Sequence, residues 1–391
     1  MRIPAVMMLD GEMRGTLGIA RSFGKKRIPI IAGGQHTLHR TGYSRYVQKS
    51  FVYPDPGVSM EDAHRAISKR IEQDRPDVLM PLYDGGWEIF YRYQDHYEKI
   101  IRIAPHPDFE LYKVLRDKAR LAECALNHGV VIPKSFMPKT MEDALSQKES
   151  YPYPVLLKAR KGIAGHEIQR ADNAFQLCDI LNKRSDIPLI QECIEGEDLE
   201  LTILCNRGQP IAGHVYLSIR NVPLPYGPPV ACRSIRDNEF LAKGCKFLQD
   251  IGYHGVGHLD YRRDRRDGRP KLLDFNARVA GTNEISIRTG VDFAYMQYQL
   301  AIGERVQQCF TYELGREFCW IFPGELRHLA QTPKKLKNLR HLINWRKVST
   351  EISLSDPVPH LCLIIDYLNR KMHSKLPSLS NRVAQVLSRK E

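Results

Sequence analysis

Apolar residues in the first part of this chain form short runs, and the stretches between them carry apolar residues at helical spacing. The runs predict buried strands at 5–9, 28–32 and 77–81, and the stretches between them predict helices at 16–23 and 60–74. Strands that alternate with helices are typical of a parallel sheet. We therefore expect residues 1–107 to form an α/β domain.

The rest of the chain alternates less regularly. A helix is predicted from Lys118 to about His128, with Asp117 as its cap or first-turn acid and Gly129 as its stop. A second helix is expected at 240–251 and a third at 360–372. Strands are predicted at 154–159, 189–197, 200–204, 211–219, 257–261, 272–278 and 318–322.

Polar residues interrupt two of these apolar strands in a regular way. Residues 257–261 and 272–278 flank a turn containing Asp267-Gly268, a strong hairpin signal. Pairing the two strands can bring Asp260 beside Asp274, and Asn276 projects to the same face as Asp274 because strand side chains alternate. Arg278 continues the row. Two carboxylates and an amide oxygen suit Mg²⁺.

The formal net charge of +13 allows nucleic acid, a membrane surface or phosphate-bearing substrates as partners. Much of the excess lies between 326 and 347, which holds seven Lys or Arg and no acidic residue. No zinc-finger, RNP-type or helix-turn-helix motif accompanies it. A solvated basic helix face is the default interpretation, and nucleic acid is not an expected partner.

The 391 residues suffice for two or three domains. The nine cysteines show no CxxC spacing, which fits reduced thiols in a cytoplasmic protein. No signal-peptide pattern and no apolar run of membrane-spanning length is present. The glycines at 11, 15 and 18 lack the G-x-G-x-x-G spacing, so a dinucleotide site is not expected.

Asp260, the hairpin and the following Asp-x-Asn-x-Arg of residues 274–278 resemble the ATP-grasp superfamily, whose usual form is Glu-x-Asn-x-Arg. Segments 281–284 and 289–293 resemble it as well, especially its carbamoyl-phosphate-synthetase-like and carboxylate–amine ligase branches. The resemblance implies an α/β and α+β fold, in which a parallel-sheet pre-ATP-grasp domain precedes a two-lobed ATP-grasp fold. The implied domains are 1–107, a small lobe at 108–190, a large lobe with the metal site at 191–310, and a basic C-terminal extension at 311–391.

The same resemblance implies an ATP site. A lysine inside an apolar strand, as at Lys158, already needs an anionic partner. Phosphate contacts are implied for Lys118, Lys158 and the loop residues Lys161, Gly162 and Gly165; adenine contacts for the main chain at Glu192, Cys193 and Ile194; and a ribose contact for either Glu200 or Glu197.

The implied reaction joins a carboxylate to an amine through an acyl phosphate, using ATP and Mg²⁺, with two ions expected and Mn²⁺ as an alternative. Arg278 would orient the carboxylate, Arg233 or alternatively Arg220 would stabilise the transferring phosphate, and Asp84 could hold the amine or be a plain turn residue. The expected partners are small-molecule carboxylates and amines, and a homodimer is left open. An ATP-grasp kinase or carboxylase, or a non-catalytic module with a basic tail, are the alternatives.

Overall fold

The computed structural model describes residues 2–160, 168–224, 227–333 and 348–373. The chain forms two compact units, one made of Met1–Ile101 with Ile352–Glu391 and the other of Arg102–Glu351. The boundary after Ile101 lies near the predicted one after residue 107. The predicted C-terminal domain, in contrast, is divided between the two units.

The first unit is built on a parallel sheet, as the alternation of strands and helices predicted. Its strands run in the order β3-β2-β1-β4, and every described pairing among them is parallel. These strands are β1 (Val6–Met8), β2 (Ile30–Gly34), β3 (Lys49–Val52) and β4 (Val78–Met80). β1, β2 and β4 are buried along their whole length, which explains their continuous apolar sequence.

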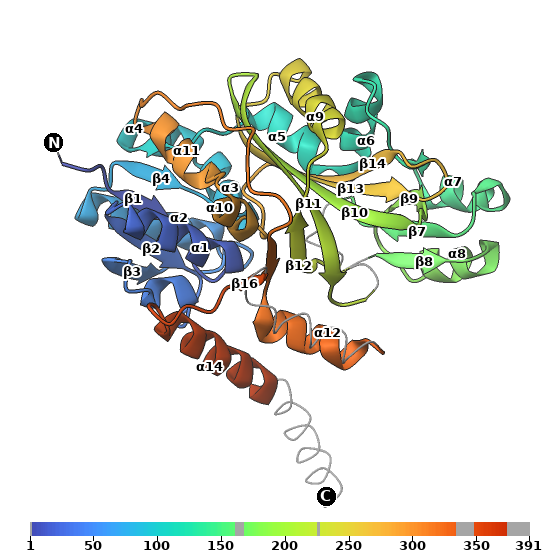
Figure 1. Cartoon of the computed structure of the whole chain (residues 1–391). Coiled ribbons are helices and arrows are strands. Elements are labelled where there is room, and N and C mark those ends of the chain that lie inside the picture. Colours follow the sequence, from blue (N-terminus) through green and yellow to red (C-terminus); the bar gives the residue numbers. More distant parts are fainter. Residues whose placement is uncertain (1, 161–167, 225–226, 334–347, 374–391) are drawn as a thin grey trace, which may run out of the picture. The chain divides into compact units, whose positions relative to one another are not determined.

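Helices accompany this sheet (Figure 1). They are α1 (Arg14–Lys25), the short 3₁₀ helix η1 (Arg40–Tyr43), α2 (Met60–Asp74), α3 (Asp84–Arg92), α4 (Gln94–Ile100) and α14 (Val358–His373). The segment before α14 is fixed by a buried ion pair, in which Arg21 Nε on α1 lies 2.9 Å from Asp356 Oδ2. Asp356 also accepts a hydrogen bond from Ser44 Oγ. These contacts hold the segment before α14 in the first unit.

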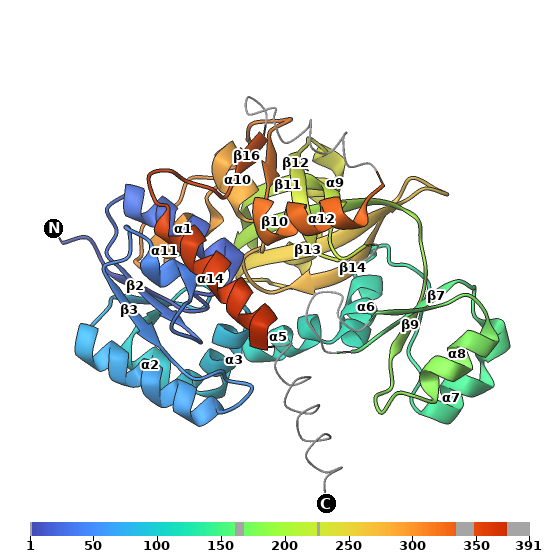
Figure 2. The ribbon, with the colours of Figure 1, turned by 90° about the horizontal axis from the view of Figure 1, so that it is seen from below.

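The second unit begins with β5 (Arg102–Ile103), α5 (Phe109–Arg116) and α6 (Lys118–Asn127) and contains a small antiparallel sheet. Its strand order is β6-β9-β7-β8. Figure 2 shows α7 and α8 beside these strands. The elements are β6 (Ser135–Phe136), α7 (Met141–Ser146), η2 (Lys148–Ser150), β7 (Val155–Lys158), β8 (Gln169–Ala171), α8 (Ala174–Leu181) and β9 (Leu189–Glu192).

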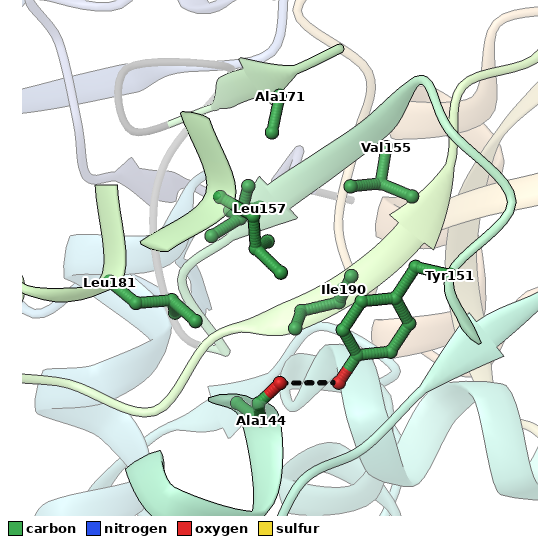
Figure 3. Close-up of a cluster of buried hydrophobic side chains, with 8 residues drawn as sticks. Ala144, Tyr151, Val155, Leu157, Ala171, Leu181 and Ile190 are labelled. Atoms are coloured by element: carbon green, nitrogen blue, oxygen red, sulfur yellow. Dashed lines mark hydrogen bonds between the residues drawn. The ribbon is translucent and has the colours of Figure 1, made fainter. Parts of the chain in front are cut away.

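One face of the small sheet is closed by an apolar cluster (Figure 3). Val155 and Leu157 of β7 pack there against Leu181 and other side chains of the two helices. Because strand side chains alternate, Leu156 and Lys158 project to the opposite face. Lys158 is therefore directed away from the apolar cluster.

The larger sheet of this unit has the order β14-β13-β10-β11-β12-β15-β16. Its strands are β10 (Gly196–Asn206), β11 (Gln209–Asn221), β12 (Pro229–Ser234), β13 (Gly255–Asp264), β14 (Pro270–Asn276), β15 (Glu317–Cys319) and β16 (Val348–Thr350). Of these, β10, β11, β13 and β14 lie side by side in Figure 1.

The two faces of this sheet differ in chemistry. The helix α9 (Asn238–Asp250) packs on β10 and β11, and a Cβ at its Gly244 would lie 2.2 Å from Leu201. Phe240 of α9 meets the ring of Tyr261 edge to face. Leu201 and Tyr261 thus belong to the face covered by α9, and the alternate residues of the same strands form a polar face on the other side.

The remaining elements are α10 (Glu284–Thr289), α11 (Phe293–Ala301), the π-helical turn η3 (Ile321–Glu325) and α12 (Leu326–Gln331). The strand predicted at 318–322 is shorter than expected. It ends at Cys319 because Glu351 accepts the backbone hydrogen bonds of Ile321 and Phe322. Most of the basic tract, from 334 to 347, lies outside the described residues. In the part of the chain that is described, no helix is long and apolar enough to span a bilayer.

Candidate active site

The β13–β14 hairpin carries three side chains with oxygen donors on the polar face of the large sheet. Asp260 is paired directly opposite Asp274, and His258 directly opposite Asn276. Opposed residues project to the same face, and Asn276 Nδ2 donates a hydrogen bond of 3.2 Å to Asp260 Oδ2. Asp260, Asp274 and Asn276 therefore lie together as the hairpin pattern predicted, and their role as metal ligands stays a prediction.

Two further side chains join this row from β13 and β10. The Nε2 atom of His258 lies 3.0 Å from Glu200 Oε2 and 3.0 Å from Asp260 Oδ1. The other ring nitrogen, Nδ1, lies 3.1 Å from Thr202 Oγ1. Glu200 and His258 are buried, whereas Asp260 keeps a side-chain exposure of 34%. The cluster is thus open to ligands on the side of Asp260.

The charges of this cluster are strongly coupled. Burial, together with the Asp260 charge, raises the pKa of Glu200 to about 8. Burial alone would lower the pKa of His258, but the adjacent Asp260 and Glu200 carboxylates raise it to about 9. Burial would likewise raise the pKa of Asp260, yet His258 holds it well below its usual range. In the metal-free cluster, the charged forms of His258 and Asp260 thus stabilise each other.

Lys118 supplies a positive charge at the edge of the row. Its Nζ lies 3.4 Å from Asp274 Oδ2, and both side chains are partly exposed. The helix α6 begins at Lys118 because Asp117 caps it, with Oδ1 accepting from the backbone N–H of Ala119 at 2.9 Å. The predicted cap, Asp117, thus fixes the start of α6 and places Lys118 as its first residue.

Lys158 approaches from the small sheet. Its Nζ donates to Gln191 Oε1 at 2.7 Å, and the side chain is buried. Burial lowers the pKa of the Lys158 ammonium to about 8, although the nearby charge of Asp274 opposes this shift. The apolar strand sequence predicted an anionic partner, and the structure provides the neutral Gln191 as the direct contact and Asp274 as the nearby anion.

Arg278 follows β14, which ends at Asn276, so the row continues beyond the strand itself. Its Nη2 donates to Asn276 Oδ1 and its Nη1 to the carbonyl of Val279, each at 3.0 Å. Glu284 forms an ion pair with Arg288. The guanidinium is thereby fixed next to the oxygen donors.

Both arginines considered for the transferring phosphate form ion pairs with glutamates. Arg233 is paired opposite Leu217, which lies in the row of Leu199 and not in that of Glu200, so it projects to the face opposite the carboxylates. Its Nε donates to Glu317 Oε1 at 2.6 Å. This placement argues against the phosphate role expected for Arg233. The alternative, Arg220, is bound to the buried Glu325 at 2.7 Å.

The linker whose main chain is expected to bind adenine runs from β9 to β10. The side chain of Glu192 accepts from Arg266 Nη2 at 2.9 Å, the N–H of Cys193 donates to the carbonyl of Pro154 at 2.8 Å, and Ile194 is buried. The main-chain donor at Cys193 is thus already bonded. Adenine recognition by this linker stays a prediction.

The two candidates for the ribose contact lie on opposite faces of β10. Glu200 is paired opposite Asp260, and Glu197 is exposed and paired opposite Arg263. The sequence predicted that Glu200 begins a strand. In the structure it lies within β10, which starts at Gly196. Only Glu200 shares the face of Asp260, and there it contacts His258 and Ser218.

Asp84 belongs to the first unit, where it is buried at the start of α3. The turn before it is held by Asp10, whose carboxylate accepts from the N–H groups of Leu82, Tyr83 and Gly86. Gly86, in the first turn of α3, leaves room for this carboxylate, because a Cβ there would lie 2.6 Å from Asp10 Oδ2. The amine contact of Asp84 stays a prediction. Lys161, Gly162 and Gly165 lie outside the described residues.

His258, Gln191 and the position of Glu200 beside Asp260 were missed at the sequence level. The Gly-His-Leu-Asp-Tyr sequence does place His258 on the face of Asp260, two residues away. The contact of Gln191 with Lys158 and the position of Glu200 beside Asp260 depend on pairing between strands that are far apart in the sequence. The sequence carries no local signal for such pairing.

The donors of the polar face fit a divalent cation. Asp260 and Asp274 offer carboxylate oxygens and Asn276 an amide oxygen, which hard cations prefer. Glu200, His258 and Asp260 together offer three ligand atoms that lie within 4.8 Å of one another. The residues present therefore suit a metal ion of the kind that accompanies nucleotide phosphates.

A family model described as the carbamoyl-phosphate synthase L chain, ATP binding domain, matches residues 227–309, which include the hairpin and Arg278. The carbamoyl phosphate synthase large chain of Thermotoga petrophila is 24% identical over 66% of this chain and 25% of its own length. The D-aspartate ligase of Enterococcus faecium is 24% identical over 74% of this chain and 75% of its length. The 2-oxoglutarate carboxylase small subunit of Hydrogenobacter thermophilus is 28% identical over 52% and 47%. The chain thus spans about a quarter of the carbamoyl phosphate synthase large chains that it matches.

Solved structures share the fold. The biotin carboxylase domain dimer of Hydrogenobacter thermophilus 2-oxoglutarate carboxylase, in complex with MgADP, ADP and bicarbonate, gives a TM-score of 0.65 at 19% identity, covering 81% of this chain and 74% of that one. The N5-carboxyaminoimidazole synthetase of Staphylococcus aureus gives 0.64 at 13% identity, covering 81% and 82%. The L-amino acid ligase of Bacillus licheniformis gives 0.59 at 16% identity, covering 78% and 75%.

These matches agree with the landmarks of the site. The family model covers Asp260, Asp274 and Asn276, and the solved structures match about four fifths of the chain. The chain therefore has the ATP-grasp fold, and its residues 227–309 match the ATP-binding domain of the carbamoyl-phosphate synthase L chain.

Proposed function

We propose that this protein is an ATP-dependent ligase that activates a carboxylate as an acyl phosphate and joins it to an amine, releasing ADP and phosphate. The observation that carries the proposal is the row of Asp260, Asp274 and Asn276 on one sheet face, with Lys118 3.4 Å from Asp274. The similarity to a D-aspartate ligase over three quarters of each chain supports the ligase assignment.

In the first step two anions, the carboxylate and the γ-phosphate of ATP, must react with each other. A carboxylate oxygen attacks the γ-phosphorus of ATP, the bond to the β,γ-bridging oxygen breaks, and ADP leaves. Bound Mg²⁺ would neutralise part of the phosphate charge and hold the phosphates against Asp260, Asp274 and Asn276. Lys118 and Lys158 supply further positive charge at the same face, where it stabilises the transferring group.

The second step transfers the acyl group. The amine nitrogen attacks the acyl carbon, the carbon–oxygen bond to phosphate breaks, and the amine gives up a proton as the amide forms. Arg278 suits the carboxylate because a guanidinium binds both of its oxygens in a fixed geometry. Asp84 is proposed to hold the amine. The proposed nucleotide contacts are the linker at Glu192, Cys193 and Ile194, the ribose carboxylate Glu200 or Glu197, and the loop with Lys161, Gly162 and Gly165.

A carboxylase is the second candidate, and a specific observation favours it. One curated relative is a 2-oxoglutarate carboxylase subunit, and a neighbouring structure holds MgADP and bicarbonate. Bicarbonate is itself a carboxylate that can take a phosphoryl group from ATP, so the same row of residues would serve both reactions. That structure is a dimer, which supports a homodimer here as well.

A trapping experiment tests the proposal. The protein is incubated with ATP, Mg²⁺, hydroxylamine and a panel of carboxylates, without an amine substrate. The ligase mechanism requires a hydroxamate and ADP in equal amounts for at least one carboxylate. A parallel set with ¹³C-bicarbonate detects label in the product, which would favour the carboxylase. Failure of both arms across a broad panel, with ATP bound, would leave an ATP-grasp kinase or a non-catalytic module.

A further inference from the structure

His258 stands out from the other donors of the site because it is a nitrogen base. Its Nε2 faces Glu200 Oε2 and Asp260 Oδ1, each at 3.0 Å. The cluster lies beside the row of Asp260, Asp274 and Asn276 and shares Asp260 with it. We propose that Glu200, His258 and Asp260 form a second cation position in which His258 is a direct nitrogen ligand, and that this position takes a first-row transition-metal ion such as Mn²⁺.

The orientation of the imidazole is fixed from its other side. Nδ1 lies 3.1 Å from the hydroxyl of Thr202, which is paired opposite His258 across β10 and β13. Metal-binding histidines are held in the same way, with the second ring nitrogen bonded to a neighbouring group. Thr202 therefore directs Nε2 toward the two carboxylates.

Asp260 is suited to bridge the two positions. One of its oxygens, Oδ1, faces His258, and the other, Oδ2, receives the amide of Asn276 at 3.2 Å. Along the sheet, Asp260 is paired with Glu200 on one side and with Asp274 on the other. A carboxylate between two donor sets can give one oxygen to each ion.

The distances agree with shared coordination. Neighbouring ligands of an octahedral ion with bonds of about 2.1 Å lie about 3.0 Å apart. Nε2 stands at 3.0 Å from both carboxylate oxygens, so an ion bound to these atoms would replace the proton that His258 holds there. A hydrogen-bonded imidazole gives the same spacing, so the experiment has to observe the metal–nitrogen bond itself.

The donor types select the ion. Mg²⁺ takes oxygen ligands almost exclusively, whereas imidazole nitrogen suits first-row transition metals. Two carboxylates and one imidazole thus favour Mn²⁺ over Mg²⁺ at this position. With Glu200 as a metal ligand, the proposed ribose contact falls to the other candidate, Glu197. The inference deepens the proposed function and rests on the same site, since the second ion would lie next to the nucleotide phosphates.

Pulsed electron paramagnetic resonance tests the bond directly. Mn²⁺ is added in less than equimolar amount to the chelator-treated full-length protein, with and without a non-hydrolysable ATP analogue. A coordinated imidazole produces ¹⁴N modulation in the echo decay, and protein grown on ¹⁵N-histidine should replace it with the ¹⁵N pattern. This comparison needs no mutation, so it does not depend on a variant that folds.

Two variants assign the signal. His258→Gln should abolish the modulation and reduce the preference for Mn²⁺ over Mg²⁺ in calorimetry by about tenfold or more. His128→Gln changes an exposed histidine at the end of α6 and is the control. It should keep both the nitrogen modulation and the preference for Mn²⁺. Mn²⁺ that binds without nitrogen modulation would overturn the inference and leave the ligase proposal intact. Nitrogen modulation from His258 in a protein that traps no hydroxamate would support the inference and contradict the ligase proposal.

Discussion

Asp260 lies directly opposite Asp274 in the pairing of β13 with β14, and the nearest cation to Asp274 in the described ion pairs is Lys118, at 3.4 Å. Two carboxylates held side by side repel each other unless a cation lies between or beside them. Asp260 is balanced by His258, and Asp274 by Lys118. The proposed metal would take over part of this balancing role when it binds the two carboxylates.

Removing the charge of Asp274 tests whether Asp260, Asp274 and Asn276 hold the proposed Mg²⁺. Asp274→Asn keeps the size of the side chain and should lower ATP turnover at least a hundredfold, because it removes one of the two carboxylate charges that would hold Mg²⁺. The measurement is ADP release at a series of Mg²⁺ concentrations. Asp172→Asn, at an exposed ion pair with Arg170 beyond β8, is the control and should retain full turnover. Normal turnover of Asp274→Asn with unchanged Mg²⁺ dependence would refute the assignment.

Lys158 should contribute to nucleotide affinity. Lys158→Met keeps the length of the side chain and removes the charge, so ATP affinity should fall by about 1.5–3 kcal/mol, the range for hydrogen bonds to charged groups. Calorimetry with a non-hydrolysable analogue measures this loss. Lys139→Met, at an exposed position before α7, should bind as the wild type does. Equal affinity of Lys158→Met and wild type would make Lys158 a structural residue.

Asp10 predicts a pH dependence of stability in the first unit. Burial, aided by the charge of Glu12, raises the pKa of Asp10 to about 7 from an ordinary value of 3.8. Between these values the folded state binds more protons than the unfolded state, so stability falls as pH rises from about 4 to about 7. The three bonded N–H groups of the β4–α3 turn limit the shift but do not reverse it.

The matched variant is Asp10→Asn, which removes this titration. Its free energy of unfolding in urea should depend less on pH than that of the wild type, with a difference of at most roughly 4 kcal/mol between pH 4 and pH 8. The amide can offer a donor where the carboxylate accepted, so a loss of stability that is constant with pH is expected as well. Parallel pH profiles of the two proteins would exclude Asp10 as the titrating group.

Arg278 separates substrate binding from bracing of the site. Arg278→Lys keeps the charge and loses the paired hydrogen bonds, so KM for the carboxylate should rise about tenfold or more while ATP affinity changes little. Steady-state kinetics with the carboxylate and the nucleotide varied in turn make the distinction. If Arg278 only braces Asn276, both substrates should suffer alike and the melting temperature should drop.

The sequence determined the local parts of this site. The Asp267-Gly268 turn and the two-residue period of the flanking strands were enough to put Asp260, Asp274 and Asn276 on one face, since both signals act within a few residues. The cap of α6 at Asp117 was equally local. The parallel sheet of the first unit followed from the order of its strands and helices.

Only the tertiary structure decided which distant residues complete the row. Glu200 reaches His258 because β10 pairs with β13, and Arg233 is turned away because β12 pairs with β11 in the register that aligns it with Leu217. Lys158 meets Gln191 through the pairing of β7 with β9. A strand's own sequence fixes which residues alternate, but a shift of one residue against its neighbour exchanges the two faces. That register is set by packing of the whole sheet against α9 and the other helices, and therefore cannot be read from any one segment.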